Sequence, residues 1–119
     1  MSYEIYLPQT FQRCIKHLKK KFPHIKDDLL PLFQSLQKDP RIGDSIPGWN
    51  RKMWKIRASS RDLKRGKSGA FRLIYAWTSG EPIFYPLFVY FKGEKAEITK
   101  AEIEALLKKL FLELELPSQ

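Results

Sequence analysis

The chain has 119 residues, which is enough for one domain with one modest core. Its 22 lysines and arginines outnumber 13 aspartates and glutamates, so the formal net charge is +9, and 43% of its residues are hydrophobic. The single cysteine, Cys14, excludes an internal disulfide. Without a leader-like segment or an apolar run of about 18 residues, the sequence predicts a cytoplasmic protein that does not enter a membrane.

The first part of the chain predicts a short strand followed by a helix. Residues 3–7 are expected to form the strand, which stops at Pro8. Apolar residues at helical spacing then predict a helix between Phe11 and Phe22, with Cys14 packed in the core. The opposite helix face is basic, and we expect it to be solvated rather than to bind a partner. Its basic residues are Arg13, Lys16, Lys19 and Lys20.

A second helix is predicted by apolar residues at positions 25–36, and Pro31 leaves its start open. In one alternative, Asp27 or Asp28 caps the helix and Pro31 lies in its first turn. In the other, the helix starts near His24 and is kinked at the proline. The two helices are expected to pair as a hairpin, whose shared apolar stripe needs a sheet to cover it.

Three strands are predicted in the second half of the chain, after a loop over residues 41–50. They span residues 53–58, 70–78 and 83–91, and the turn signal before the last strand indicates an antiparallel meander. Trp49 in the preceding loop either covers an edge of the core or offers a stacking platform for a base. We favour the core edge, because aromatic side chains mostly pack.

A final helix is predicted after Thr99, which forms a capping box with Glu102. Its apolar residues, at positions 103–116, make a stripe wider than one buried face requires. The helix is therefore either wedged into its own core or shares this surface with a partner. The predicted fold class is α+β, with the N-terminal strand and the meander in one small antiparallel sheet, packed against the helical hairpin and followed by the C-terminal helix.

The region around the first two meander strands holds most of the net charge. Residues 51–67 contain eight cations against one anion, Asp62, which is +7 of the chain's +9. A charge this concentrated favours a polyphosphate partner, although basic hairpin loops are also often only solvated. The eight cations are Arg51, Lys52, Lys55, Arg57, Arg61, Lys64, Arg65 and Lys67.

Some of these cations lie inside predicted strands. Alternation places Lys55 and Arg57 on one sheet face and Trp54 and Ile56 on the other. A cation within a strand must face water or a ligand, because burial without a partner is costly. Arg72 in the next strand can share the face of Lys55 and Arg57. These three cations therefore form a candidate anion site.

The chemistry open to such a site is cationic. His17 and His24 have no cysteine pair or carboxylate cluster with them, so the sequence predicts no metal site and no cofactor. RNA carries its own nucleophile, the 2′-hydroxyl, beside each phosphodiester. Cleavage then needs a proton acceptor, positive charge on the phosphorane and a proton for the leaving 5′ oxygen. Lys55 is a candidate to exchange a proton as well as to supply charge.

Two segments around this candidate site resemble a known family. Trp54-Lys-Ile-Arg57, followed by Gly66-Lys-Ser-Gly-Ala-Phe-Arg-Leu-Ile-Tyr75, is similar to the RelE/ParE superfamily of bacterial toxins, on its RelE-like and HigB-like side. In those toxins a loop rich in Gly, Lys and Ser leads into a strand of this composition. The order of the surrounding elements also matches, so the resemblance covers most of the chain and implies a single RelE-like domain over residues 1–119.

The resemblance implies a toxin of a type II toxin-antitoxin system that cleaves messenger RNA on translating ribosomes. The family's catalytic strand cations carry over to Lys55, Arg57 and Arg72. A further basic residue near the end of the last strand corresponds to Lys92, with Lys95 as the alternative. The remaining cations of residues 51–67, together with Lys95, are expected to bind RNA.

The resemblance also implies partners, namely a cognate antitoxin, messenger RNA and the ribosome, with operator DNA reached through the antitoxin. The chain departs from the family pattern at residues 94–99, which hold neither the Tyr nor the His that several members have. The general base and acid therefore stay open, with Glu94 and Glu97 as candidates. The alternatives are a ParE-type gyrase poison, or a non-catalytic RNA-binding or decayed toxin. Lys55, Arg57 and Arg72 together favour the nuclease.

Overall fold

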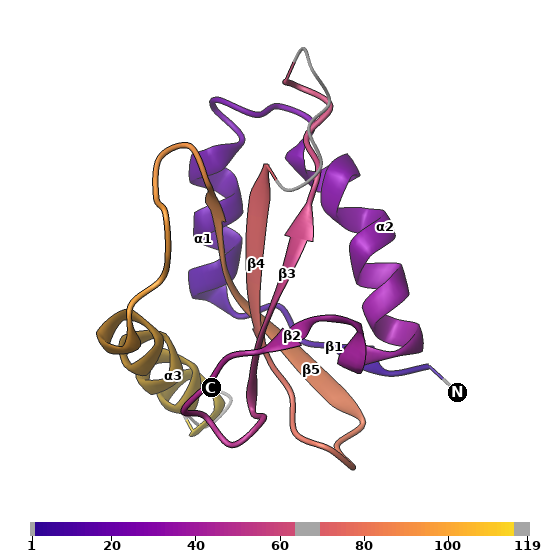
Figure 1. Ribbon diagram of the computed structural model, residues 1–119, viewed down its shortest axis with the longest axis vertical. Helices are drawn as coiled ribbons and strands as arrows, with labels where there is room; N and C mark the ends of the chain where they lie inside the picture. Colours follow the sequence, from indigo (N-terminus) through magenta and orange to yellow (C-terminus); the bar gives the residue numbers. More distant parts are fainter. Residues whose placement is uncertain (1, 64–69, 116–119) are drawn as a thin grey trace.

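The computed structural model describes residues 2–63 and 70–115. A twisted five-stranded sheet is flanked by two helices toward its upper end and by the last helix at its lower left (Figure 1). None of the described helices has the length and apolarity needed to cross a membrane. In chain order the elements are β1 (Glu4–Ile5), α1 (Gln9–Leu18), α2 (Ile25–Lys38), the 3-10 helix η1 (Pro40–Ile42), β2 (Asp44–Ser45), β3 (Met53–Ala58), β4 (Phe71–Ala76), β5 (Ile83–Phe91) and α3 (Lys100–Glu115).

The strands lie in the order β1-β5-β4-β3-β2. The antiparallel meander of β3, β4 and β5 is confirmed, and β3 and β5 have the predicted bounds. The prediction of a wholly antiparallel sheet is wrong at β1, which pairs in parallel with β5 through Glu4 opposite Ile83. Residues 41–50 are not entirely a loop either, because Asp44 pairs with Lys55 and makes β2 an edge strand.

The start of α2 decides between the two alternatives that the sequence left open for the second helix. α2 begins at Ile25 and holds Pro31 in its interior, so the alternative of a start near His24 is correct. The Asp28 N–H donates to the His24 carbonyl at 3.0 Å, which places Asp28 inside the helix rather than at its cap. α1 ends at Leu18 instead of continuing to Phe22, yet Phe22 is buried and packs edge-on against Phe71.

One face of the sheet forms the main core with α1 and α2. Trp54 and Tyr75 lie opposite each other on β3 and β4, are buried, and stack with ring centroids 6.3 Å apart. The Tyr75 hydroxyl donates to the Pro40 carbonyl at 2.6 Å and accepts from the Gly43 N–H. These bonds tie the segment before β2 to the centre of the sheet.

The other face of the sheet is covered only in part, by α3. The capping box is confirmed, because the Thr99 N–H donates to Glu102 Oε1 and the Glu102 N–H donates to Thr99 Oγ1. Only Ile103 and Leu110 of α3 are buried, against a cluster that includes Met53, Ile74 and Tyr90. Trp49 packs on the same cluster, which confirms its core-edge role.

Part of the apolar stripe of α3 is not buried in the protein's own core. Phe111, Leu112 and Leu114 are 56%, 55% and 45% exposed. The reading of a helix wedged into its core is therefore wrong for the described residues, and Leu116 lies outside them. The use of this surface by a partner stays a prediction.

Candidate nucleic-acid interface

Three cations predicted for the site share one face of the sheet. Arg57 lies directly opposite Arg72, and Lys55 lies two residues away on β3, opposite Ile74. Residues paired across antiparallel strands point to the same face, as do residues two apart along a strand. Lys55 and Arg57 are exposed and Arg72 is half-buried. The structure therefore brings these three side chains onto the face opposite the main core.

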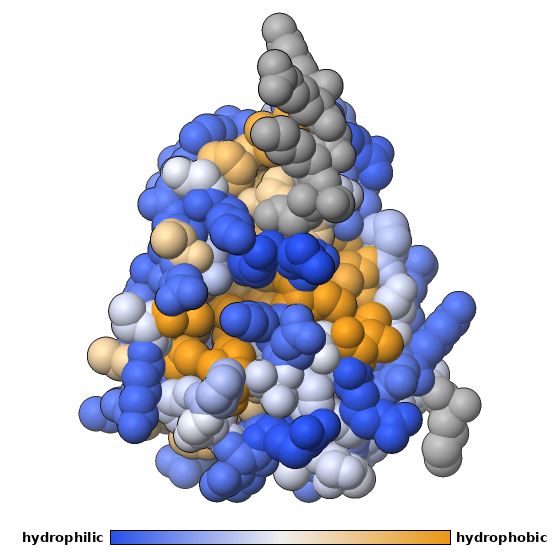
Figure 2. Space-filling view, viewed as in Figure 1, coloured by the Kyte–Doolittle hydropathy of each residue, from blue (hydrophilic) through white to orange (hydrophobic). Residues whose placement is uncertain are grey.

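The pairing of Arg57 with Arg72 is electrostatically unfavourable by itself. Like charges directly opposite each other on neighbouring strands destabilise a sheet, by about 0.2–1 kcal/mol. Figure 2 shows strongly hydrophilic side chains over the middle of one face, bordered by apolar surface. Two arginines held opposite each other on one sheet face are suited to binding an anion.

Tyr90 extends this row and was missed by the sequence reasoning. Tyr90 is on β5, and it pairs with Arg72 on β4, which in turn pairs with Arg57 on β3. The three residues therefore form one row across three strands. Burial raises the pKa of the Tyr90 hydroxyl, and Glu97 raises it further, while Arg72 lowers it. A search for Tyr or His confined to residues 94–99 could not find Tyr90. The signal that could have done so is its position opposite Arg72 in the meander.

Lys92 follows β5 by one residue. Its N–H donates to the Ala70 carbonyl at 2.9 Å, so the pairing with the β4 side continues past the end of the strand. Strand alternation then gives Lys92 the same face as Tyr90, and the residue is exposed. Lys92 therefore lies at the border of the row of Arg57, Arg72 and Tyr90.

Two further charged residues in the turn after β5, Glu94 and Lys95, already have partners. Lys95 forms an ion pair with Glu102 at the start of α3, with Nζ 2.5 Å from Oε2. Glu94 forms an ion pair with Lys21, in which Oε1 of Glu94 lies 2.7 Å from Nζ of Lys21. These ion pairs link the turn after β5 to the segment that follows α1 and to the first turn of α3.

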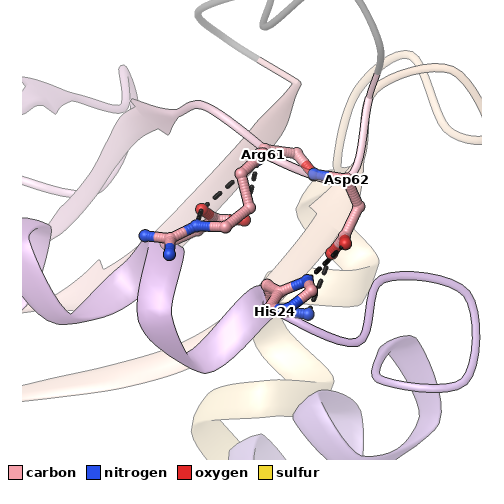
Figure 3. A network of polar contacts seen from close by, with 5 residues as sticks. His24, Arg61 and Asp62 are labelled. Carbon is pink, nitrogen blue, oxygen red and sulfur yellow. Dashed lines mark hydrogen bonds and ion pairs between the residues drawn. The ribbon is translucent and has the colours of Figure 1, made fainter.

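Arg61, which was predicted to bind RNA, forms an ion pair with a residue of α2. Its Nε lies 2.9 Å from Asp28 Oδ1, and the Asp28 side chain is only 6% exposed. Next to it, His24 Nδ1 lies 2.6 Å from Asp62 Oδ1, and this hydrogen bond is the main cause that lowers the pKa of Asp62 (Figure 3). The two pairs anchor residues 61–62 to the start of α2, so Arg61 does not join the strand cations.

The remaining predicted cations fall into two groups. Arg51 and Lys52 are exposed at the other end of β3, and the Arg51 guanidinium lies over the Trp54 ring, 5.5 Å from its centroid. They flank the candidate interface rather than complete it. Lys64, Arg65 and Lys67 lie outside the described residues.

Cys14 is placed for packing and not for nucleophilic chemistry. Its thiol donates to the Val89 carbonyl with the two heavy atoms 3.0 Å apart. Burial raises the pKa of this thiol, which disfavours the reactive thiolate. The predicted core role of Cys14 is consistent with this environment.

Comparison with known proteins supports the architecture. No family model matches the sequence. A free-state mutant of the Escherichia coli toxin RelE superposes with a TM-score of 0.58 at 17% identity, over 92% of this chain and 99% of that one. The RelBE2 toxin-antitoxin complex from Mycobacterium tuberculosis gives 0.51 at 17% identity, over 76% of this chain and 99% of the matched chain. At this level of identity the likeness concerns the architecture, and the chain has the RelE fold.

Proposed function

We propose that this protein is the toxin of a type II toxin-antitoxin pair and an endoribonuclease that cuts messenger RNA on the ribosome. The observation that carries the proposal is the row formed by Arg57, Arg72 and Tyr90, with Lys55 on the same face. The RelE-like fold supports it. A second support is that Lys55, Arg57 and Arg72, which the sequence resemblance marks as catalytic, share one face of the sheet.

The proposed reaction is transesterification at one phosphodiester. The 2′ oxygen loses its proton and attacks the adjacent phosphorus, and the bond from phosphorus to the 5′ oxygen breaks. The 5′ oxygen takes up a proton, so the products are a 2′,3′-cyclic phosphate and a 5′-hydroxyl end. The nucleophile belongs to the substrate, so the protein must supply only charge, position and proton transfer.

Each side chain of the site has a role that suits its placement. Arg57 and Arg72 stabilise the extra negative charge on the phosphorane, because both sit on one row of the sheet. Lys55 is the candidate for taking the 2′ proton. Tyr90, whose raised pKa keeps the hydroxyl protonated, and Lys92 are the candidates for protonating the 5′ oxygen. Each acid–base role contributes roughly 10²–10⁴-fold to the rate.

The proposal includes an antitoxin, and two surfaces suit one. Acidic residues of such a partner can neutralise Lys55, Arg57 and Arg72, and an amphipathic segment can cover the exposed side chains at Phe111 and Leu114 on α3. RelBE2 is a toxin-antitoxin complex on the same fold. Hydrogen exchange on residues 99–115, with and without the product of an adjacent reading frame, tests this. Unchanged protection there and around Arg72 would remove both surfaces from consideration.

The nuclease itself is tested in a translating extract, by mapping new 5′-hydroxyl ends on a reporter messenger RNA. The wild type should produce them, and the double variant Lys55→Ala/Arg72→Ala should not. Lys26→Ala/Lys38→Ala, which removes two exposed lysines from α2, is the control for charge alone and should cut normally. Growth arrest by the first double variant, as strong as that by the wild type, would instead favour the gyrase-poison alternative.

A further inference from the structure

A pocket of about 340 Å³ lies beside Arg57 and Arg72 and is lined in part by Tyr90. Apart from Tyr90, its lining residues have no role in the mechanism above. The pocket lies where α1, the second half of β5 and the turn after β5 meet. Figure 1 shows the segment between β5 and α3 arching away from the sheet beside α1. The residues that matter for its chemistry are Cys14, His17, Phe88, Tyr90, Glu94 and Lys95.

The position of the pocket is set by the register of the sheet. Tyr90 lies opposite Arg72, and Phe88 lies opposite Ile74 in the next position along the same face. Neighbouring strands are about 4.8 Å apart. The aromatic wall of the pocket is therefore one strand away from Arg72, a spacing that suits neighbouring parts of one nucleotide.

The wall itself is aromatic. The rings of Phe88 and Tyr90 lie 5.8 Å apart between centroids, with an angle of 29° between their planes. Phe88 is half-buried, whereas Tyr90 is 6% exposed. A partly open ring supported by a buried one offers a flat surface, and the exposed His17 on α1 adds a polar ring to the pocket's lining.

Cations beside an aromatic wall match the chemistry of single-stranded RNA. Its phosphates bind arginine and lysine, and its unpaired bases stack on aromatic side chains. Here the two kinds of group lie on adjacent strands, with Arg72 next to Tyr90. A nucleotide whose phosphate meets Arg57 and Arg72 can therefore place a base against Phe88.

We propose that this pocket holds one nucleobase adjacent to the scissile phosphate, with Phe88 as its stacking surface. The inference rests on the proposed function, since it assigns a subsite to the same RNA. Phe88 is in this view a positioning residue, which acts by holding the base and not by touching the reacting atoms.

The experiment measures binding of short single-stranded RNA by fluorescence anisotropy at low salt. A pentanucleotide is compared with versions that carry one abasic site at each position in turn. One position should be sensitive in the wild type, where loss of the base weakens binding at least about fivefold, the lower limit for one stacked base. Phe88→Leu should weaken binding of the intact RNA and abolish that position's sensitivity, whereas Phe88→Tyr should retain it.

Two controls separate this inference from the function on which it rests. Phe33→Leu alters an equally half-buried phenylalanine on α2 and should leave the abasic pattern as in the wild type. Arg57→Gln should weaken intact and abasic RNA alike. If RNA binds but Phe88→Leu keeps the wild-type abasic pattern, the pocket is not a base site and the proposed function stands. If the wild type binds none of the RNAs, the inference fails, whereas the proposed function is decided separately by cleavage in the translating extract.

Discussion

Arg57 on β3 lies opposite Arg72 on β4, and we expect that this pairing of like charges lowers the stability of the fold. Within the described residues no ion pair involves Arg57, which lies opposite Arg72 and is exposed. Replacing it by glutamine removes a like-charge pair of about 0.2–1 kcal/mol. For a domain of this size, Arg57→Gln should therefore raise the melting temperature by about 1–4 °C at low salt.

The same substitution should damage activity, because it removes charge from the row that faces the phosphorane. The expected loss is roughly 10²-fold or more in the rate of RNA cleavage. The stability gain should shrink with added salt, since the Debye length falls from about 10 Å at 0.1 M to about 3 Å at 1 M. Thermal melts across this range and cleavage assays on the same preparations give both readouts.

Arg61→Gln is the matched control, because it changes the same residue type four positions away. It breaks the ion pair with Asp28, which keeps the hydrogen bonds from the Arg61 backbone N–H, so stability should fall by up to about 1 kcal/mol. The cleavage rate of the folded fraction should stay near the wild-type value. If Arg57→Gln destabilises the protein as much as Arg61→Gln does, and salt does not alter the effect, then Arg57 is a structural residue and the argument for an anion site on this row is wrong.

Three further outcomes are expected. Lys55→Gln should lower the slope of log affinity for RNA against log salt by about one, as the loss of a phosphate contact requires. Asp62→Asn should make stability fall less steeply below about pH 4, the ordinary pKa range of an aspartate. The reason is that His24 lowers the pKa of Asp62 in the folded state, so the stabilisation present above that range is lost as the carboxylate protonates. Gly43→Ala should cost about 1–3 kcal/mol, because its Cβ would lie 2.5 Å from the Tyr75 hydroxyl oxygen and 2.8 Å from the Lys55 carbonyl oxygen.

Each of these outcomes has a direct check. An unchanged salt slope in the Lys55→Gln variant would show that this lysine meets no phosphate. Asp27→Asn alters an exposed carboxylate near the start of α2, and an acid unfolding curve equal to that of Asp62→Asn would refute the special role of the His24 hydrogen bond. Tyr75→Phe by itself loses the hydrogen bonds of the Tyr75 hydroxyl to Pro40 and Gly43. In that background Gly43→Ala should cost less in denaturant unfolding than it does in the wild type, since one of the two clashes is gone.

The meander was predictable because its strands alternate in sequence. Lys55 and Arg57 interrupt an otherwise apolar run at a period of two, and that period fixes the face on which they lie. Sequence alternation does not fix the pairing partner, and the register between β4 and β5 shifts between Ile74 and Tyr75. Tyr90 was therefore missed, although it is the neighbour of Arg72.

The short edge strands could not be predicted, because their pairing depends on distant parts of the chain. β1 pairs in parallel with β5, a segment about 80 residues further along the chain. The hydrogen bond from the Glu4 N–H to the Pro82 carbonyl is one of the bonds that join them. β2 is two residues long and depends on the close approach of Gly43 to Tyr75. Arg61 was assigned to RNA from charge alone, and only the fold reveals Asp28 as its partner.

Glu113 in the last helix accepts hydrogen bonds from the Tyr6 hydroxyl at 2.6 Å and from the Gln9 N–H at the start of α1 at 2.9 Å. The first helix thus receives a partner for one of its initial N–H groups from a residue that is synthesised 104 positions later. At translation rates of about 5–20 residues per second, that interval is roughly 5–20 s. During synthesis the N-terminal segment must therefore wait for α3, and these hydrogen bonds form only after Glu113 has left the ribosome.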